Sequence, residues 1–179
     1  GLVASVLLRG YLLTGRREYL KLAGEAIETM LTPVDKGGTL VEDSRGVWVE
    51  EVITDPPSHI LNGFMFSIIS LHEYHLVTGE RKEILNKLIR TLERNISLYD
   101  LDYWSLYDLY YKRLAPLNYH IIHIRQLKWL YAMFGVNRFK EVSSKWEAKA
   151  QKTSTYFKLL VKRLTYILSN RVKPLTPRT

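Results

Sequence analysis

Apolar residues recur every three to four positions along most of this chain, which is the spacing of an amphipathic helix. The helices that this pattern predicts cover residues 2–14, 17–31, 62–78, 81–96 and 119–134, with a sixth that begins near Asn137. Glycine or proline follows the apolar pattern in four places, and predicts helix ends at Gly15, Pro33, Gly79 and Gly135. The pattern therefore predicts pairs of helices joined by short turns and separated by longer insertions.

Two of the longer insertions contain β-prone residues. Residues 39–41 and 47–49 are apolar, β-branched or aromatic, and the turn sequence Ser-Arg-Gly at 44–46 lies between them. This arrangement predicts a short β-hairpin. The segment 103–109 is rich in aromatic residues and predicts a short strand or a loop.

A short repeat links three of the predicted helix ends. Tyr-Leu-Leu-Thr-Gly at 11–15 recurs 64 residues later as His-Leu-Val-Thr-Gly at 75–79, and more weakly as Tyr-Ala-Met-Phe-Gly at 131–135. Repeated helical hairpins bury their apolar faces against one another. We therefore expect a mainly α fold, an incomplete α/α toroid of helical hairpins with short β-hairpin insertions. A generic all-α domain whose Thr-Gly helix ends coincide by chance is the alternative.

Charge is distributed unevenly along the chain. Residues 1–111 carry 11 basic and 16 acidic side chains, whereas residues 112–179 carry 15 basic and 2 acidic ones. The basic part would attract nucleic acid, anionic lipid or an acidic polysaccharide, although a solvated basic surface needs no partner at all. Residues 151–179 predict a basic amphipathic C-terminal helix and tail, which would pack against this protein, contact a partner or lie on a membrane surface.

The absence of cysteine excludes disulfides and thiolate chemistry. The sequence has no apolar run of bilayer-spanning length and no export signal at its start, so it leaves the cellular compartment open. It enters an apolar helical pattern directly after Gly1, which predicts a truncated start. We expect one domain over residues 1–150.

Acidic, aromatic and histidine side chains gather in the predicted joints between helices. They are Glu50, Glu51, Asp102, Tyr103, Trp104, Tyr107, Asp108, Asn118, Tyr119, His120 and His123. Aromatic rings stack on pyranose faces and polar groups orient hydroxyls, so these residues predict a sugar groove, with core packing as the alternative for each tyrosine. His120 and His123 share a helix face, but nothing nearby has metal-ligand spacing, so structural or pocket histidines are favoured. No metal or other cofactor is predicted.

Four blocks of sequence resemble the D-glucuronyl C5-epimerase family, in the same order. Residues 55–67, Asp-Pro-Pro-Ser-His-Ile-Leu-Asn-Gly-Phe-Met-Phe-Ser, resemble a Pro-Ser-Ser-Phe-Val-Leu-Asn-Gly-Phe stretch of its C-terminal domain. Glu50-Glu51 precede this stretch as in the family, residues 106–109 match a Tyr-Asp-Leu block, and residues 118–127 match Tyr-His-x-x-His-Ile-x-Gln-Leu. Residues 9–14 also resemble the family's first toroid helix. The resemblance covers roughly residues 1–150.

The resemblance implies an activity and a site. The family inverts C5 of D-glucuronate within a heparan-type polymer to give L-iduronate, and it carries β-rich domains ahead of the helical one, so this chain would hold only the last part. At the matching positions, Glu51 and Tyr119 are implied to be the catalytic acid/base residues, and Tyr107 to belong to the same site. The expected partner is an acidic polysaccharide rather than nucleic acid, and a homodimer is left open.

Inversion at C5 needs a proton removed from one face of the sugar and returned to the other, with donors aimed at the substrate carboxylate. A carboxylate and a tyrosine can serve, provided that nearby cations or donors lower the tyrosine's reference pKa of about 10. His120, His123 and Arg125 are the candidate neighbours for this task. The predicted substrate-binding residues are Tyr107, Asn62, His120, His123, Arg125 and Trp104.

Two positions depart from the family pattern. Val52 stands where the family has a tyrosine, and Tyr110 where it has an arginine that would suit the substrate carboxylate. Lys112 or Arg113 is the candidate replacement. The alternatives to epimerisation are a polysaccharide lyase, which shares abstraction of the C5 proton but expels the C4 substituent, and an inactive polyanion-binding fragment.

Overall fold

The computed structural model describes residues 1–152 and residue 161. The described residues form six α-helices, two strands and two short 3-10 helices, so the mainly α prediction is confirmed. The elements are α1 (Leu2–Thr14), α2 (Arg17–Leu31), η1 (Val34–Lys36), β1 (Leu40–Asp43), β2 (Gly46–Val49), α3 (Leu61–Thr78), α4 (Lys82–Asn95), η2 (Ile96–Tyr99), α5 (Leu117–Phe134) and α6 (Asn137–Ala150). The predicted helix and tail over 151–179 lie almost entirely outside the described residues.

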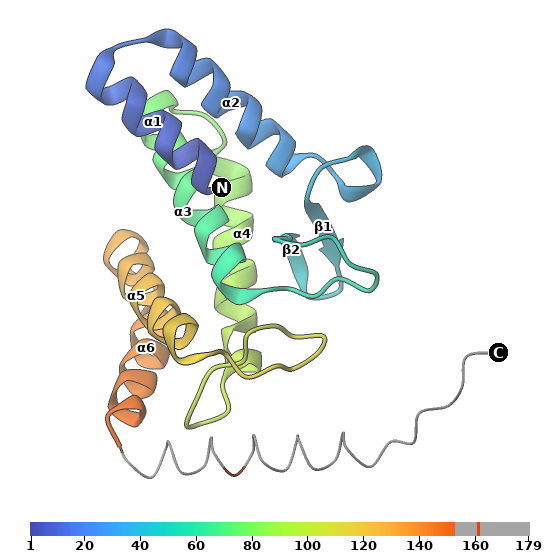
Figure 1. Cartoon of the computed structure of the whole chain (residues 1–179), viewed down its shortest axis with the longest axis vertical. Helices are drawn as coiled ribbons and strands as arrows, with labels where there is room; N and C mark the ends of the chain where they lie inside the picture. The colour runs from blue at the N-terminus through green and yellow to red at the C-terminus, as the bar shows by residue number, and fades with distance from the viewer. Residues whose placement is uncertain (153–160, 162–179) are drawn as a thin grey trace, which may run out of the picture.

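Consecutive helices pair as hairpins, with α3 at the centre of the arrangement (Figure 1). The three pairs are α1 with α2, α3 with α4, and α5 with α6. Helix α3 also contacts both α1 and α5. Three hairpins side by side do not by themselves establish a ring, so the incomplete toroid stays a prediction.

The repeated glycines end the first helix of each pair in the same way. Gly15, Gly79 and Gly135 adopt left-handed φ values of 68°, 76° and 69°. Each donates its backbone N–H to the carbonyl four residues earlier, at 2.8, 2.7 and 2.8 Å. A residue without a Cβ adopts this conformation without strain. The sequence repeat is therefore also a structural repeat.

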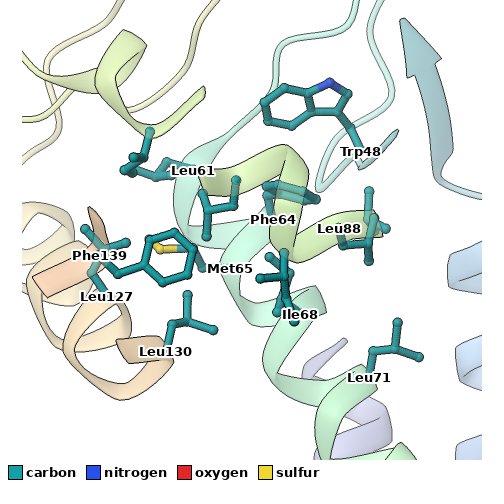
Figure 2. Packing of buried hydrophobic residues seen from close by; sticks show 14 of the residues in the cluster. Trp48, Leu61, Phe64, Met65, Ile68, Leu71, Leu88, Leu127, Leu130 and Phe139 are labelled. Carbon is teal, nitrogen blue, oxygen red and sulfur yellow. The ribbon is translucent and has the colours of Figure 1, made fainter. Parts of the chain in front are cut away.

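The core is built around α3. This helix is apolar on most of its circumference and is accordingly covered by other elements on several sides. Phe64 faces Trp48 of the β-hairpin, and Met65 packs against Leu127 of α5 and Phe139 of α6 (Figure 2). This central position fixes the N-terminal turn of α3 relative to the hairpin and to α5. No described helix has the length and apolarity needed to cross a membrane.

The predicted β-hairpin is present, whereas the aromatic segment 103–109 is a loop. β1 pairs antiparallel with β2, with Leu40 opposite Val49 and Asp43 opposite Gly46. The aromatic segment makes only single bridges, because its backbone bonds to nearby loop residues: Leu106 N donates to Tyr99 O at 2.8 Å and Tyr107 N to Arg113 O at 2.7 Å. This folding back places side chains of 104–113 beside the first turns of α3 and α5.

Candidate active site

Glu51 follows β2 and lies against the first turn of α3. Its Oε2 accepts a hydrogen bond from Asn62 Nδ2 at 3.4 Å. A Cβ on Gly63 would lie 2.6 Å from the Glu51 Cβ, so only glycine allows this close approach. The residue is exposed, and its carboxylate sits at the helix end that favours negative charge.

The surroundings of Glu51 change its acidity. Partial desolvation raises the pKa of the carboxyl group, and the Asn62 hydrogen bond opposes this shift. A carboxylate with a raised pKa is a better proton acceptor, because its conjugate acid is weaker. The position therefore suits acid–base chemistry.

Tyr107 and Tyr119 contact each other edge to face, with ring centroids 5.1 Å apart and an interplanar angle of 78°. Tyr119 lies in the first turn of α5, and the carbonyl of Tyr107 accepts a hydrogen bond from Leu61 N at the start of α3, at 3.0 Å. Desolvation first, then the negative charge of Glu51, raises the pKa of Tyr107. The structure thus places Glu51, Tyr107 and Tyr119 in one neighbourhood, although they are far apart in sequence.

Arg113 brings a positive charge to this neighbourhood. Its guanidinium carbon lies 5.2 Å from the ring centroid of Tyr107 and 5.1 Å from that of Tyr111. Its Nε donates to Oδ2 of the buried Asp108 at 2.6 Å. Its positive charge opposes the raised pKa of Tyr107. Of the two basic residues that the sequence offered here, Arg113 rather than Lys112 contacts the tyrosine.

Asn62 connects the two helices that carry the site. The residue is buried, and its backbone carbonyl accepts a hydrogen bond from Gln126 Nε2 on α5 at 3.1 Å. Gln126 follows Tyr119 by seven residues and so lies on nearly the same face of α5. Sequence reasoning missed Gln126, although it is part of the Gln-Leu that ends the 118–127 block.

His120, His123 and Trp104 lie behind the site, fully or almost fully buried. The Ser105 hydroxyl is 2.8 Å from His120 Nδ1 and 2.9 Å from His123 Nδ1, and Trp104 stacks on His120 with ring centroids 3.8 Å apart. The Trp104 Nε1 donates to Ala115 O at 2.7 Å. These side chains form a packed support for the first turns of α5.

Burial corrects the electrostatic role expected of these histidines. Desolvation lowers the pKa of His120 to about 4 and that of His123 to about 3. Both imidazoles are therefore neutral at pH 7 and supply no positive charge beside Tyr119, whereas a role as hydrogen-bond donors, the other expectation, stays a prediction. The rings of His120, His123 and Trp104 are buried, so a substrate cannot reach them in this conformation. Their assignment to substrate binding stays a prediction that the geometry does not support.

Arg125 lies on another side of α5. It follows Tyr119 by six residues, which turns it away from that side chain by roughly a third of a turn. The residue is exposed. The structure does not bring Arg125 into contact with Glu51, Tyr107 or Tyr119, and a substrate contact by this residue stays a prediction.

A second buried polar cluster lies directly behind Glu51. His59 Nδ1 is 2.6 Å from Glu50 Oε1 and its Nε2 is 3.3 Å from Asp43 Oδ2. The ring stacks on Trp48, with centroids 4.3 Å apart. Both His59 and Glu50 are buried. This cluster ties the end of the β-hairpin to the segment before α3. Sequence patterns did not predict the contact, because its members are separated along the chain.

A cavity of about 460 Å³ opens beside this cluster. Its walls are mostly apolar and are formed by Val34, Val41, Glu50, Ile53, Thr54, Asp55 and Pro57. It is separate from the tyrosine pair. Among residues 1–152 and 161, no group of three or more histidine, aspartate or glutamate side chains could hold a metal ion.

These features define a mainly helical protein with a carboxylate and two tyrosines at the meeting point of its loops. The family model described as D-glucuronyl C5-epimerase C-terminus matches residues 1–148, so the chain belongs to this family.

Two curated relatives are similar over most of the chain. A D-glucuronyl C5-epimerase of Caenorhabditis elegans is 30% identical over 146 residues, covering 70% of this chain and 24% of the relative. An uncharacterized protein of Methanocaldococcus jannaschii is 28% identical over 142 residues, covering 76% of this chain and 46% of the relative. The chain thus spans less than half the length of either relative.

Proposed function

We propose that this chain carries the catalytic residues for C5 epimerisation of D-glucuronate to L-iduronate residues in an acidic polysaccharide. The observation that carries the proposal is the meeting of Glu51 with the Tyr107–Tyr119 pair at the first turns of α3 and α5. A chain of this family that gathers a carboxylate and a phenol at one exposed place has the two groups that inversion needs.

The reaction moves one proton off and one proton on. Glu51 takes the C5 proton, and the electron pair of the broken C–H bond spreads onto the neighbouring substrate carboxylate. Tyr119 then gives its hydroxyl proton to the opposite face of C5. Glu51 is left protonated and Tyr119 ionised, and proton exchange with solvent restores both. The reverse reaction exchanges the two roles.

Val52 and Tyr110, which depart from the family pattern, lie at the rim of this neighbourhood. Their exposed fractions are 52% and 50%. They therefore offer an aliphatic and an aromatic surface to a polymer rather than the phenol and guanidinium of the family. The polymer that this chain accepts is expected to differ accordingly.

The remaining parts of the proposal concern the larger protein. The three hairpins suit one sector of an α/α toroid, and the relatives have ample further length for the rest. The excess of basic residues after position 111 suits an acidic polysaccharide. Polymer binding by the complete protein would then use both this sector and neighbouring domains.

Incubation with a glucuronate polymer in deuterated water tests the proposal. Epimerisation incorporates deuterium at C5, detected by mass spectrometry, and yields iduronate. Inversion needs both groups, so Glu51→Gln and Tyr119→Phe should each lower the formation of deuterated iduronate by at least about 100-fold. Glu93→Gln on α4 and Tyr11→Phe on α1 are the matched controls and should retain it.

Other outcomes identify other functions. A rise in ultraviolet absorbance without iduronate formation would indicate a lyase, because elimination creates a conjugated double bond. Salt-sensitive binding of the polymer without deuterium incorporation or absorbance change would leave a polyanion-binding protein. Either result overturns the epimerase proposal.

A further inference from the structure

Arg113 is held in a fixed position by three different contacts. Its Nε donates to the buried carboxylate of Asp108, and its guanidinium plane lies close to the rings of Tyr107 and Tyr111. Asp108 is itself fixed, because its Oδ1 accepts a hydrogen bond from Tyr111 N at 2.6 Å. Stacking on aromatic rings and an ion pair to one nitrogen restrict the rotation of a long side chain before any ligand arrives.

The outer part of this guanidinium remains available. The side chain is 55% exposed, and among residues 1–152 no hydrogen bond engages its two Nη groups. Two parallel Nη donors match the two oxygens of a carboxylate. The two exposed Nη groups of Arg113, whose guanidinium is anchored through Nε, are therefore preorganised for an anion.

The Arg113 guanidinium lies close to the proposed reacting groups. Arg113 and Glu51 both act on Tyr107, with opposite effects on the pKa of that phenol, and Tyr107 in turn contacts Tyr119. The substrate carboxylate is bonded directly to C5. A sugar whose C5 lies between Glu51 and Tyr119 would therefore present its carboxylate to the same small region.

We infer that Arg113 binds the uronate carboxylate and so determines specificity for acidic sugars. This inference rests on the proposed function, and it assigns to Arg113 the task that the arginine at the position of Tyr110 would have performed. Binding there also places a positive charge on the carboxylate when the C5 proton leaves, which stabilises the charge that develops. The Arg113 side chain acts by direct contact, and Asp108 acts by holding it.

Binding of two ligands to the wild type and to two variants tests this inference. The ligands are an oligosaccharide of alternating glucuronate and glucosamine, and the same oligosaccharide with its carboxylates reduced to primary alcohols. The full chain should bind the carboxylated ligand about 10- to 100-fold more tightly by calorimetry. Arg113→Gln should lose this preference and leave binding of the reduced ligand unchanged, whereas the exposed control Arg90→Gln should keep it.

A second variant separates recognition from folding. Arg113→Lys keeps the charge beside Tyr107 but cannot form the two parallel hydrogen bonds, so its preference should fall between those of the wild type and Arg113→Gln. Thermal melting of each variant checks that Asp108 still packs. The wild type alone can also be compared with the carboxylated and the reduced ligand, and this comparison cannot be disturbed by misfolding of a variant.

The outcomes are distinguishable from a failure of the proposed function. The same preference for carboxylate in Arg113→Gln as in the wild type, or no preference in the wild type, overturns the role of Arg113. A preference that Arg113→Gln abolishes, combined with no deuterium at C5, supports the carboxylate site and rejects the epimerase proposal.

Discussion

Behind the candidate site lie two buried sets of histidines, which differ in what faces their ring nitrogens. His59, near the β-hairpin, has a carboxylate at each nitrogen, from Glu50 and Asp43. His120 and His123, on α5, instead share one hydroxyl group between their Nδ1 atoms. The three imidazoles are equally buried. Burial alone therefore does not distinguish them, and their partners do.

The difference lies in the partners. Carboxylate oxygens of Glu50 and Asp43 face the two ring nitrogens of His59, so each nitrogen lies against a hydrogen-bond acceptor. The Ser105 N–H points at His120 Nδ1, at 3.3 Å, which requires that this nitrogen accept and be unprotonated. A cluster that contains two carboxylates thus lies beside Glu51, and a cluster of neutral imidazoles lies beside Tyr119. The comparison makes opposite predictions for the two clusters.

Breaking the cluster of His59, Glu50 and Asp43 should have the largest effect. His59→Phe preserves an aromatic ring beside Trp48 but leaves the buried Glu50 carboxylate without its closest partner. Loss of one partner from a buried ion pair typically costs about 3–5 kcal/mol in unfolding free energy. Urea denaturation at pH 7 measures it, and His75→Gln, at the end of α3, should change stability by less than about 1 kcal/mol.

A paired substitution sharpens this result. An ion pair between His59 and Glu50 predicts that the double variant Glu50→Gln/His59→Gln is more stable than the single variant His59→Gln, which leaves the buried Glu50 side chain without that partner. Equal losses in the single and double variants would mean that His59 and Glu50 do not form a charged pair.

Acid should weaken the neutral cluster. His120 and His123 have pKa values of about 4 and about 3 when folded, against about 6.5 in an unfolded chain. Between these values only the unfolded state binds the protons, so the contribution to stability is complete above about pH 6.5, falls as the pH drops from about 6.5 to the folded pKa values, and changes no further below them. Each histidine contributes up to about 1.4 kcal/mol per pH unit.

Denaturation at a series of pH values checks this expectation. His123→Leu should reduce the slope of stability against pH between pH 6.5 and 5, whereas His75→Gln should leave the slope nearly unchanged. A slope in His123→Leu equal to that of the wild type would show that His123 is not held neutral by the fold.

Removing the shared hydroxyl should have the smallest effect. Ser105→Ala deletes one group that bridges two neutral rings and leaves no buried charge unpaired. The expected loss is about 1–2 kcal/mol in unfolding free energy, measured by urea denaturation. The exposed Ser44→Ala is the matched control. A loss as large as that of His59→Phe would contradict the distinction between the two clusters.

Much of the helical framework could be predicted because its signals are local. Helices α1 and α2 have the predicted bounds, and the predicted starts of α3 and α5 fall within one and two residues of those observed. Apolar spacing defines a helix face, and a glycine ends it, within a few residues. The segment 103–109 was harder, because single bridges to neighbouring loops leave no alternating pattern in the sequence.

The candidate site was predictable only where a motif marked it. Glu51, Tyr107 and Tyr119 were selected from the family resemblance, and the structure brings them together, while their catalytic roles stay predictions. The position of Arg113 over Tyr107 depends on how the loop folds back. The link from Gln126 to Asn62 depends on the packing of α5 against α3.

The sequence by itself determined the helical pairs, their glycine ends and the family, because each follows from residues close together in the chain or from ordered blocks. Only the tertiary structure decided which groups face each buried histidine, which cation contacts Tyr107 and what lies beside the candidate catalytic pair. Charge and acidity depend on desolvation and on the nearest polar groups. For His59, Tyr107 and Glu51, some of those groups come from segments well separated along the chain.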